Sequence, residues 1–169
     1  MKLNLDVNTL IDTLAERLRD DPIMGKAPCM VGIRTGGVWI AERLHAALGL
    51  EMPLGVLDIS FYRDDFSRVG LNPTVRPSDI PWDVEGSRII LVDDVLYTGR
   101  TIRAALNELF DYGRPDEVLL TTLVERPGCR ELPICAKYVG ATVNCDQAVK
   151  LSGPEPLELN IVERKAEVA

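Results

Sequence analysis

The sequence is poor in the side chains that build metal sites and covalent catalytic triads. It holds one histidine, His45, and four cysteines, Cys29, Cys129, Cys135 and Cys145, among 169 residues. His45 lies in a helical pattern, and no two cysteines have C-x-x-C spacing. We therefore expect His45 to be an ordinary helix residue, and the cysteines to be reduced thiols rather than zinc ligands or disulfides.

Long apolar runs and an excess of basic residues are also absent. No stretch approaches ~18 uninterrupted apolar residues, and no basic segment with a following apolar run opens the sequence. We therefore expect a cytoplasmic protein without a membrane span. The formal net charge of -7 gives no support for nonspecific nucleic-acid binding. Arginine outnumbers lysine, and guanidinium groups suit the capture of phosphate.

What the sequence does contain is an alternation of helical patterns with short apolar runs. Its length and its hydrophobic fraction of 46% favour a single globular domain over residues 1–169. Helices between apolar strands imply an α/β fold, in which helices flank a mainly parallel central sheet and ligands bind at the carboxyl ends of the strands. We expect strands at residues 29–33, 54–59, 87–92 and 118–124, and helices at residues 38–48 and 102–112, besides one that Asn8 or Thr9 caps.

Two segments depart from this alternation. Residues 62–81 are polar and are interrupted by Gly70, Pro73, Pro77 and Pro81. A connection of this length in a small domain indicates a functional flap loop. Residues 147–162 are too few for a domain, so we expect them to add one or two strands at the sheet edge or over the site.

A site is expected where the third apolar run ends. Asp93 and Asp94 follow the run S-R-I-I-L-V, and a turn rich in small and hydroxyl residues leads from them into a helix. Backbone N–H groups at the start of that helix suit a phosphate, and Gly99 lets the backbone approach it closely. Carboxylates repel phosphate but bind sugar hydroxyls or hydrated Mg²⁺. This arrangement predicts a ribose 5-phosphate site.

The residues IILVDDVLYTGRT, from Ile89 to Thr101, resemble the phosphoribosyl pyrophosphate (PRPP) motif of type I phosphoribosyltransferases. The form V-L-Y-T-G-R-T is similar to one branch, the pyrimidine operon attenuation protein and uracil phosphoribosyltransferase family (PyrR). The segments VGIRTGGVWIAERL, DISFYRDDFSR, SDIPWDVEG and RELPICAKYVG resemble the same family in the same order. The resemblance covers roughly residues 5 to 162. It implies the type I phosphoribosyltransferase fold, with a flap at about 62–81 and a small hood at about 125–150 plus the N-terminal segment.

The resemblance also implies a role for particular residues. Arg63, Asp93 and Asp94 would be catalytic, and the two aspartates would hold Mg²⁺ indirectly, through water and ribose. The residues expected to bind PRPP or nucleotide are Arg34, Thr35, Gly36, Gly37, Asp93, Asp94, Val95, Leu96, Tyr97, Thr98, Gly99, Arg100 and Thr101. The flap would contribute Tyr62, Arg63, Asp64 and Arg68, and the hood would read the base with Val124, Glu125, Arg126 and Arg130.

The implied partners are PRPP, uracil, UMP or UTP, and a second copy of the chain in a homodimer or higher homo-oligomer. One alternative is an RNA-binding attenuator of pyrimidine genes that responds to UMP or UTP and has little or no catalysis. Cys129 and Ala141 stand where the family usually has a histidine and a basic residue on the surface implicated in binding the mRNA leader. These departures weaken the RNA-binding expectation. Another alternative, a purine or orotate phosphoribosyltransferase, is disfavoured by V-L-Y-T-G-R-T.

Overall fold

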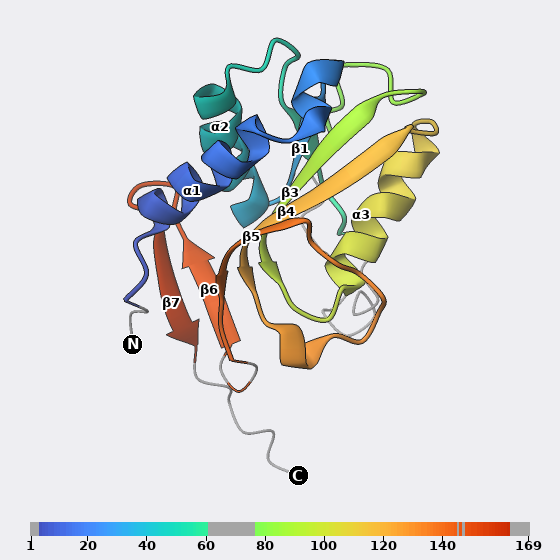
Figure 1. Ribbon diagram of the computed structural model, residues 1–169. Helices are drawn as coiled ribbons and strands as arrows, with labels where there is room; N and C mark the ends of the chain where they lie inside the picture. The colour runs from blue at the N-terminus through green and yellow to red at the C-terminus, as the bar shows by residue number, and fades with distance from the viewer. Residues whose placement is uncertain (1–3, 61–76, 145, 147, 163–169) are drawn as a thin grey trace.

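A five-stranded parallel sheet forms the centre of the molecule (Figure 1). The computed structural model describes residues 4–60, 77–144, 146 and 148–162. The strands lie in the order β2-β1-β3-β4-β5, so β3 is central. They are β1 (Cys29–Ile33), β2 (Gly55–Leu57), β3 (Arg88–Leu96), β4 (Glu117–Glu125) and β5 (Tyr138–Thr142). The expected α/β fold with a mainly parallel sheet is confirmed. β5, an edge strand of this sheet, lies within the range expected for the hood.

Two helices, α1 (Val7–Arg19) and α2 (Gly36–Leu48), cover one face of the sheet, and α3 (Arg100–Asp111) lies on the other (Figure 1). The expected cap of the first helix is wrong. Asp6 is the cap, because its carboxylate accepts hydrogen bonds from Asn8 N at 3.1 Å and Thr9 Oγ1 at 2.6 Å. α2 starts two residues earlier than expected and ends at Gly49, whose φ of +60° suits glycine. Short 3₁₀ turns span Pro22–Lys26 and Pro127–Cys129.

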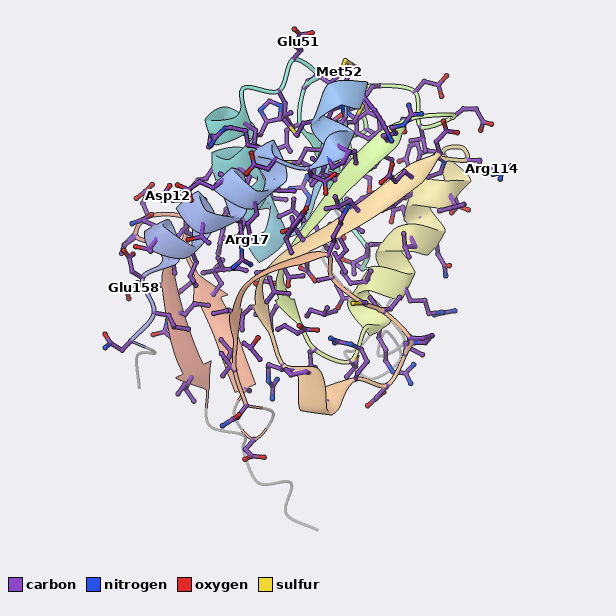
Figure 2. The ribbon with its side chains drawn as sticks, viewed as in Figure 1. Asp12, Arg17, Glu51, Met52, Arg114 and Glu158 are labelled. Atoms are coloured by element: carbon purple, nitrogen blue, oxygen red, sulfur yellow. The ribbon has the colours of Figure 1, made fainter. Side chains whose placement is uncertain are left out.

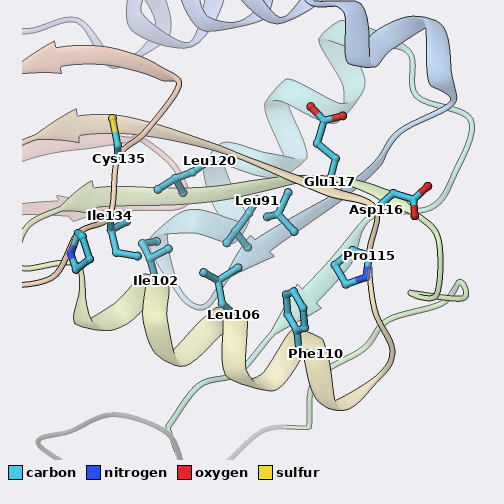
Figure 3. A pocket seen from close by; sticks show the side chains of 12 residues that line it. Leu91, Ile102, Leu106, Phe110, Pro115, Asp116, Glu117, Leu120, Ile134 and Cys135 are labelled. Carbon is cyan, nitrogen blue, oxygen red and sulfur yellow. The ribbon is translucent and has the colours of Figure 1, made fainter.

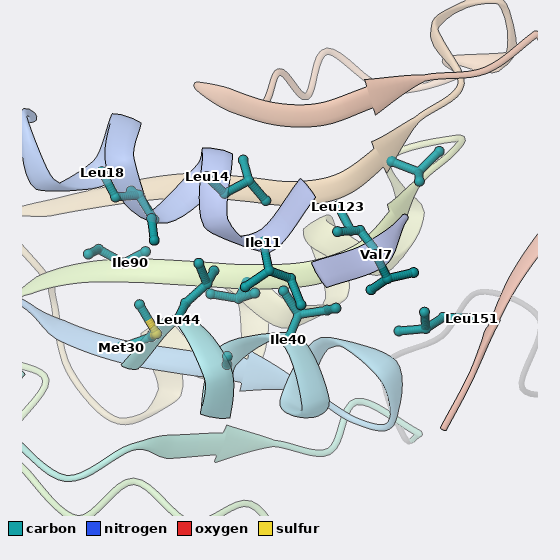
Figure 4. Close-up of a cluster of buried hydrophobic side chains, with 14 of the residues drawn as sticks. Val7, Ile11, Leu14, Leu18, Met30, Ile40, Leu44, Ile90, Leu123 and Leu151 are labelled. Carbon is teal, nitrogen blue, oxygen red and sulfur yellow. The ribbon is translucent and has the colours of Figure 1, made fainter. Parts of the chain in front are cut away.

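The central strand supplies two separate cores because successive strand side chains point to opposite faces. Ile90 and Val92 pack with α1 and α2, whereas Ile89 and Leu91 pack with α3. Figure 4 shows the first core, in which side chains of α1 and α2 meet those of the sheet. Strand β3 is therefore covered on both sides, as its continuous apolar sequence predicted. Its carboxyl end is held rigidly between the two cores.

The C-terminal tail forms an antiparallel hairpin of β6 (Ala148–Ser152) and β7 (Glu158–Val162). Leu151, Leu157 and Leu159 anchor it in the core of α1 and α2. A Cβ on Gly153 would lie 2.9 Å from Trp39, so the hairpin turn packs closely against α2. The expectation that this tail adds strands is confirmed.

One expectation about cysteine is wrong. Cys29 and Cys135 are free thiols, but Cys129 is disulfide-bonded. Pairing depends on which segments the fold brings together, and spacing along the chain does not show this. His45 Nε2, on α2, lies 2.7 Å from the carbonyl oxygen of Met52 in the segment that follows this helix. Within the part of the chain that the structure describes, no helix is long and apolar enough to span a membrane.

Candidate active site

The two expected sugar-binding acids lie within strand β3, near its carboxyl end. The strand runs on to Leu96, so they do not follow a strand that stops at residue 92 as expected. Asp93 is 4% exposed, and its Oδ1 accepts a hydrogen bond from Asp94 N at 2.9 Å. Asp94 Oδ1 accepts from Val95 N at 2.8 Å. Each carboxylate is thus oriented by the next backbone amide along the strand.

The loop Arg34–Gly37, which leads from β1 into the first turn of α2, lies directly on this strand end. A Cβ on Gly36 would be 2.2 Å from Asp94 Oδ2, and a Cβ on Gly37 would be 2.6 Å from the carbonyl oxygen of Val92. Such distances are incompatible with a side chain, so both positions require glycine. The peptide bond between Arg34 and Thr35 is cis. The loop backbone and the carboxylate of Asp94 therefore face one another in direct contact.

This loop offers positive charge and amide donors. Arg34 lines the pocket beside it, and its Nε is buried without a hydrogen-bond partner among the described residues. Buried polar groups in proteins are normally paired, so a buried guanidinium nitrogen of this kind suits an anionic ligand. Thr35 is the N-cap of α2 and makes no side-chain cap hydrogen bond. The first amides of α2 are therefore not capped by that side chain, as an anion site requires.

The expected phosphate turn leads from β3 into α3. Gly99 has φ of +92° and is the N-cap of α3, and Thr98 Oγ1 accepts from Arg100 N at 3.2 Å. A Cβ there would approach Ile134 at 3.1 Å, so backbone angle and contact both favour glycine. The carbonyl oxygen of Thr98 accepts from the backbone N–H groups of Glu131 and Leu132 at 2.9 and 3.1 Å. The segment after β4 thus closes over the turn and holds its shape.

These pieces surround one pocket of about 580 Å³. Eight of the residues expected to bind PRPP or nucleotide line it: Arg34, Thr35, Gly36, Asp93, Asp94, Val95, Tyr97 and Thr101. The pocket also has walls that the sequence analysis missed, namely Trp39, Ile59, Val149, Lys150 and Leu151. Trp39 lies one turn into α2, and the last three come from β6. The hydroxyl-poor β6 sequence gave no signal of a binding role.

Other expected site residues lie beside the pocket or outside the described part. Gly37 packs against the backbone of Val92 and does not line the pocket, and Leu96 is buried at 1% exposure. Thr98 and Gly99 shape the turn, and Arg100 extends away to Glu131, with Nε 2.7 Å from a carboxylate oxygen. The flap residues Tyr62, Arg63, Asp64 and Arg68 lie outside the described residues. Their roles stay predictions.

The four expected base-reading residues divide by position. Arg126 is 3% exposed, lines the pocket, and lies over the ring of Tyr97 at 4.3 Å from its centroid. Arg130 donates hydrogen bonds to the carbonyl oxygen of Tyr97 and to the carboxylate of Glu125. Val124 is fully buried in the core of α1 and α2. Of the four, only Arg126 reaches the pocket directly.

Comparison with known proteins agrees with this geometry. Residues 4–158 match the phosphoribosyl transferase domain family. The "Bifunctional protein PyrR" of Nitrosococcus oceani is 52% identical over 167 residues, which covers 95% of this chain and 93% of that protein. The protein of the same name from a Pseudomonas fluorescens strain is 58% identical over 136 residues, covering 79% of this chain and 80% of the relative.

Solved structures share the fold at lower identity. The hypoxanthine phosphoribosyltransferase of Trypanosoma cruzi in complex with the product IMP has a TM-score of 0.69 at 19% identity, covering 94% of this chain and 90% of that one. A purine phosphoribosyltransferase from Pyrococcus horikoshii has a TM-score of 0.60 at 27% identity, covering 82% of each chain. With the relatives at above half identity, these matches confirm the resemblance. The chain belongs to the PyrR family of type I phosphoribosyltransferases.

Proposed function

We propose that this chain transfers the phosphoribosyl group of PRPP to uracil, forming UMP and pyrophosphate. One observation carries the proposal. A pair of strand-end carboxylates, an anion loop that contains two glycines, and the first turn of α3 all meet at a single pocket. Each matches a different part of PRPP: the ribose hydroxyls, the pyrophosphate and the 5-phosphate. The high identity to proteins named bifunctional PyrR supports uracil as the base.

The substrate would lie along the pocket in one direction. Its 5-phosphate would bind the amides at the start of α3, where the helix dipole is positive. The ribose hydroxyls would donate to Asp93 and Asp94, which are held in place by backbone amides. The pyrophosphate would then lie on the loop that contacts Asp94 Oδ2, next to Arg34. In this orientation the bond between the anomeric carbon and pyrophosphate lies between the carboxyl end of β3 and the loop Arg34–Gly37.

The chemistry needs no covalent intermediate. The bond between the anomeric carbon and pyrophosphate breaks with its electron pair leaving on the pyrophosphate. Uracil N1 bonds to that carbon and gives up its proton, which the departing pyrophosphate can accept. Positive charge that develops on the sugar is favoured by the nearby carboxylate of Asp94, and Arg34 stabilises the departing anion. Preorganised charges of this kind contribute most in a pocket that is shielded from water.

The residues present fit magnesium held jointly with substrate. No group of three or more His, Cys, Asp or Glu side chains that could cage a metal occurs among the described residues. Mg²⁺ is bound in nucleotide sites by one or two carboxylates together with substrate phosphates, and Asp93 with Asp94 offers such a pair. Mg²⁺ bound with PRPP would supply charge neutralisation of the leaving pyrophosphate.

Recognition of the base is assigned to the remaining walls of the pocket. Uracil offers two carbonyl oxygens and two N–H groups. Arg126 and Lys150 are the cationic donors there, and Trp39 with the β6 residues Val149 and Leu151 forms apolar surface. A small planar polar base suits a wall that combines an aromatic side chain with a few donors.

Pyrophosphate release measured with PRPP, Mg²⁺ and a panel of nucleobases tests the proposal. We expect turnover with uracil and little with hypoxanthine, guanine, adenine or orotate. The matched control is Asp94→Asn, which keeps an oxygen able to accept from Val95 N and should retain the fold. Turnover with a purine or orotate and not with uracil would refute the base assignment. Turnover with none of these bases would refute phosphoribosyl transfer itself.

A second function, binding of a pyrimidine mRNA leader, is favoured by the word bifunctional in the relatives' names. The single chain does not gather the arginines that a basic face would need. Arg17 and Arg19 donate to the carbonyl oxygens of Val139 and Ala47, and Arg43 pairs with Glu155 at 2.8 Å. Figure 2 shows Arg17 on α1 and Arg114 far from it, beyond the end of α3.

Binding of leader RNA at several salt concentrations, with and without UMP, tests this second function. Specific binding should persist at physiological salt, tighten with UMP, and lose affinity with a slope that reflects the phosphates contacted. Loss of all binding at physiological salt, or equal binding of an unrelated RNA, would leave transfer as the sole function.

A further inference from the structure

Helix α3 carries an acidic side chain that the candidate active site does not use. Figure 3 shows Ile102, Leu106 and Phe110 of this helix turned toward the groove between α3 and the sheet. Glu108 follows Leu106 by two residues, which is a rotation of about 200° in an α-helix. It therefore lies on the opposite flank of α3. Its Oε1 accepts a hydrogen bond from the hydroxyl group of Ser78, 30 residues earlier in the chain.

Ser78 connects Glu108 to the segment that follows β2. Its Oγ accepts from Asp58 N at 2.9 Å and donates to Glu108. Beside this contact, the backbones of Val56 and Asp79 exchange two hydrogen bonds, at 2.7 and 2.8 Å. Two segments that are 20 residues apart in sequence are thus held together, and Glu108 fixes them to α3.

The segment fixed in this way enters the active site through Ile59. This side chain is 4% exposed, packs in the core of α3, and lines the candidate active-site pocket. Asp58 precedes it, and its carboxylate accepts from the backbone N–H and the hydroxyl group of Ser60 at 3.0 and 2.5 Å. Because its own N–H donates to Ser78, a displacement of Asp58 would move a wall of the pocket.

Ile59 borders the end of the pocket that is assigned to pyrophosphate. Strands β1 and β2 are neighbours in the sheet, and Arg34 N donates to the carbonyl oxygen of Leu57 at 2.9 Å. The segment after β2 therefore lies beside the loop after β1, with a backbone hydrogen bond between them. We expect a change in this segment to alter the binding of PRPP more than the binding of the base.

The surroundings of Glu108 indicate that its carboxylate has a purpose beyond helix formation. Burial raises the pKa of Glu108 above its ordinary value, the hydrogen bond from Ser78 lowers it, and the carboxylates of Asp58 and Asp111 raise it further. Alanine would avoid this cost and suits a helix at least as well. What the carboxylate adds is a strong acceptor for the hydroxyl group of Ser78.

We propose that Glu108 is a positioning residue for phosphoribosyl transfer, which acts through Ser78 to hold Asp58 and Ile59 at the pyrophosphate end of the pocket. Glu108 itself does not touch the substrate. It can act in this way only if PRPP binds in this pocket, so its role rests on the proposed function.

Glu108→Ala, Glu108→Gln and the control Asn107→Ala, at an exposed neighbouring position on α3, test this role. Glu108→Ala should raise the calorimetric dissociation constant of PRPP with Mg²⁺, and KM for PRPP, by about 5-fold, with kcat within about 2-fold of wild type. Glu108→Gln keeps an acceptor for Ser78 and should recover most of this affinity. Asn107→Ala should behave as wild type. A merely structural role would lower kcat through loss of folded protein and leave both binding constants unchanged.

Three results would overturn the role of Glu108 while wild type binds PRPP. Both Glu108 variants could keep the wild-type dissociation constant. Glu108→Ala could lower kcat alone. Glu108→Gln could lose as much affinity as Glu108→Ala, which would show that an acceptor for Ser78 is not what matters. Wild type that fails to bind PRPP would instead refute the proposed function, and the role of Glu108 with it.

Ser78→Ala provides a second route to the same answer if Glu108→Ala does not fold. It removes the same hydrogen bond from the other side, so it should raise the dissociation constant of PRPP by a similar factor. Adding Glu108→Gln to Ser78→Ala should then raise it no further, because the two residues act through one contact. Wild-type affinity in Ser78→Ala, or independent losses from the two substitutions, would contradict the proposal.

Discussion

Two aspartates in this molecule are equally buried, at 4% exposure each, yet their surroundings differ. Asp21, just before the first 3₁₀ turn, accepts hydrogen bonds from Lys137 Nζ at 2.7 Å, Tyr138 Oη at 2.6 Å and Ile23 N at 2.8 Å. Burial raises its pKa, but these hydrogen bonds outweigh burial and lower the pKa from 3.8 to about 2. Asp21 therefore connects the first 3₁₀ turn to Lys137 and to Tyr138 at the start of β5, which is a structural role.

Asp93 instead lines a pocket of about 580 Å³ next to Asp94. The loop that contains Gly36 and Gly37 lies opposite Asp94. Burial alone therefore does not separate structural from functional carboxylates. What separates them is their surroundings: three protein donors, one of them the cationic Lys137, face Asp21, whereas Asp93 and Asp94 line a pocket large enough for a ligand. We therefore expect substitutions at Asp21 to lower stability and substitutions at the end of β3 to lower activity.

The largest effect is expected from Asp94→Asn. The substitution removes the negative charge beside the sugar and keeps the acceptor for Val95 N. We expect kcat/KM for PRPP to fall by about 100-fold or more, as for loss of one preorganised charge in an active site. The thermal unfolding midpoint should stay near wild type. Unfolding measurements and pyrophosphate release on the same sample check both halves, and wild-type turnover would contradict the role of Asp94.

Gly36→Ala sharpens the comparison by pushing on the functional carboxylate without changing any charge. The new Cβ would lie 2.2 Å from Asp94 Oδ2, so either the loop or the carboxylate must move. We expect KM for PRPP to rise by roughly 10-fold or more, since small displacements at a reacting centre are costly. Gly25→Ala is the matched control, because nothing lies within 4 Å of a Cβ there. Equal kinetics for the two variants would show that the contact has no role.

Asp21→Asn should show the opposite behaviour. The amide keeps a similar shape but loses the charge that Lys137 and Tyr138 face. We expect a loss of about 2 kcal/mol in the free energy of unfolding, within the range for breaking a buried charged hydrogen-bond network. Turnover per folded molecule should be unchanged. Urea unfolding followed by circular dichroism measures the first, and a strong fall in kcat with normal stability would refute the assignment.

The smallest effect is expected when the pH is lowered and the free energy of unfolding is measured. The pKa of Asp21 is lower in the folded state, so its contribution to stability is fully present above about pH 4 and is lost as pH falls toward 2. Wild type should therefore lose stability more steeply than Asp21→Asn across this window. Unfolding free energies at several pH values between 5 and 2 provide the measurement. Parallel curves for the two proteins would mean that Asp21 is not perturbed by its partners.

Much of this fold could be anticipated from periodicity. The strand at residues 29–33 is found as expected, and the one expected at 54–59 is shorter, at Gly55–Leu57. β3 runs four residues past the expected end, and β4 is one residue longer at each end. The helix starts were less accurate, because Asp6 rather than Asn8 or Thr9 caps α1, and α2 begins at Gly36 rather than at residue 38. β5 was not anticipated as a strand of the main sheet. Its residues are only partly buried and its sequence is short, so it lacks the continuous apolar character of the inner strands.

The residues of the site also fall into those that the sequence predicted and those that it did not. Residues next to one another in the motif were predicted together, since a strand, a turn and a helix start are local features. Trp39 was missed although it lies on α2, because a helical pattern does not show which side chain faces a pocket. Lys150 and the other β6 residues were missed, because they reach the pocket only through the packing of the hairpin on α2. The contact between Gly36 and Asp94 was missed for the same reason. A sequence shows that a glycine is present, but not which atom would occupy the place of its side chain.

A crystal structure of the chain with UMP tests the central claim most directly. The account predicts that the phosphate lies on the amides at residues 98–101 and that the ribose hydroxyls donate to Asp93 and Asp94, while Asp21 keeps its bonds to Lys137 and Tyr138. UMP bound elsewhere, or both strand-end carboxylates turned away from the ribose, would contradict it.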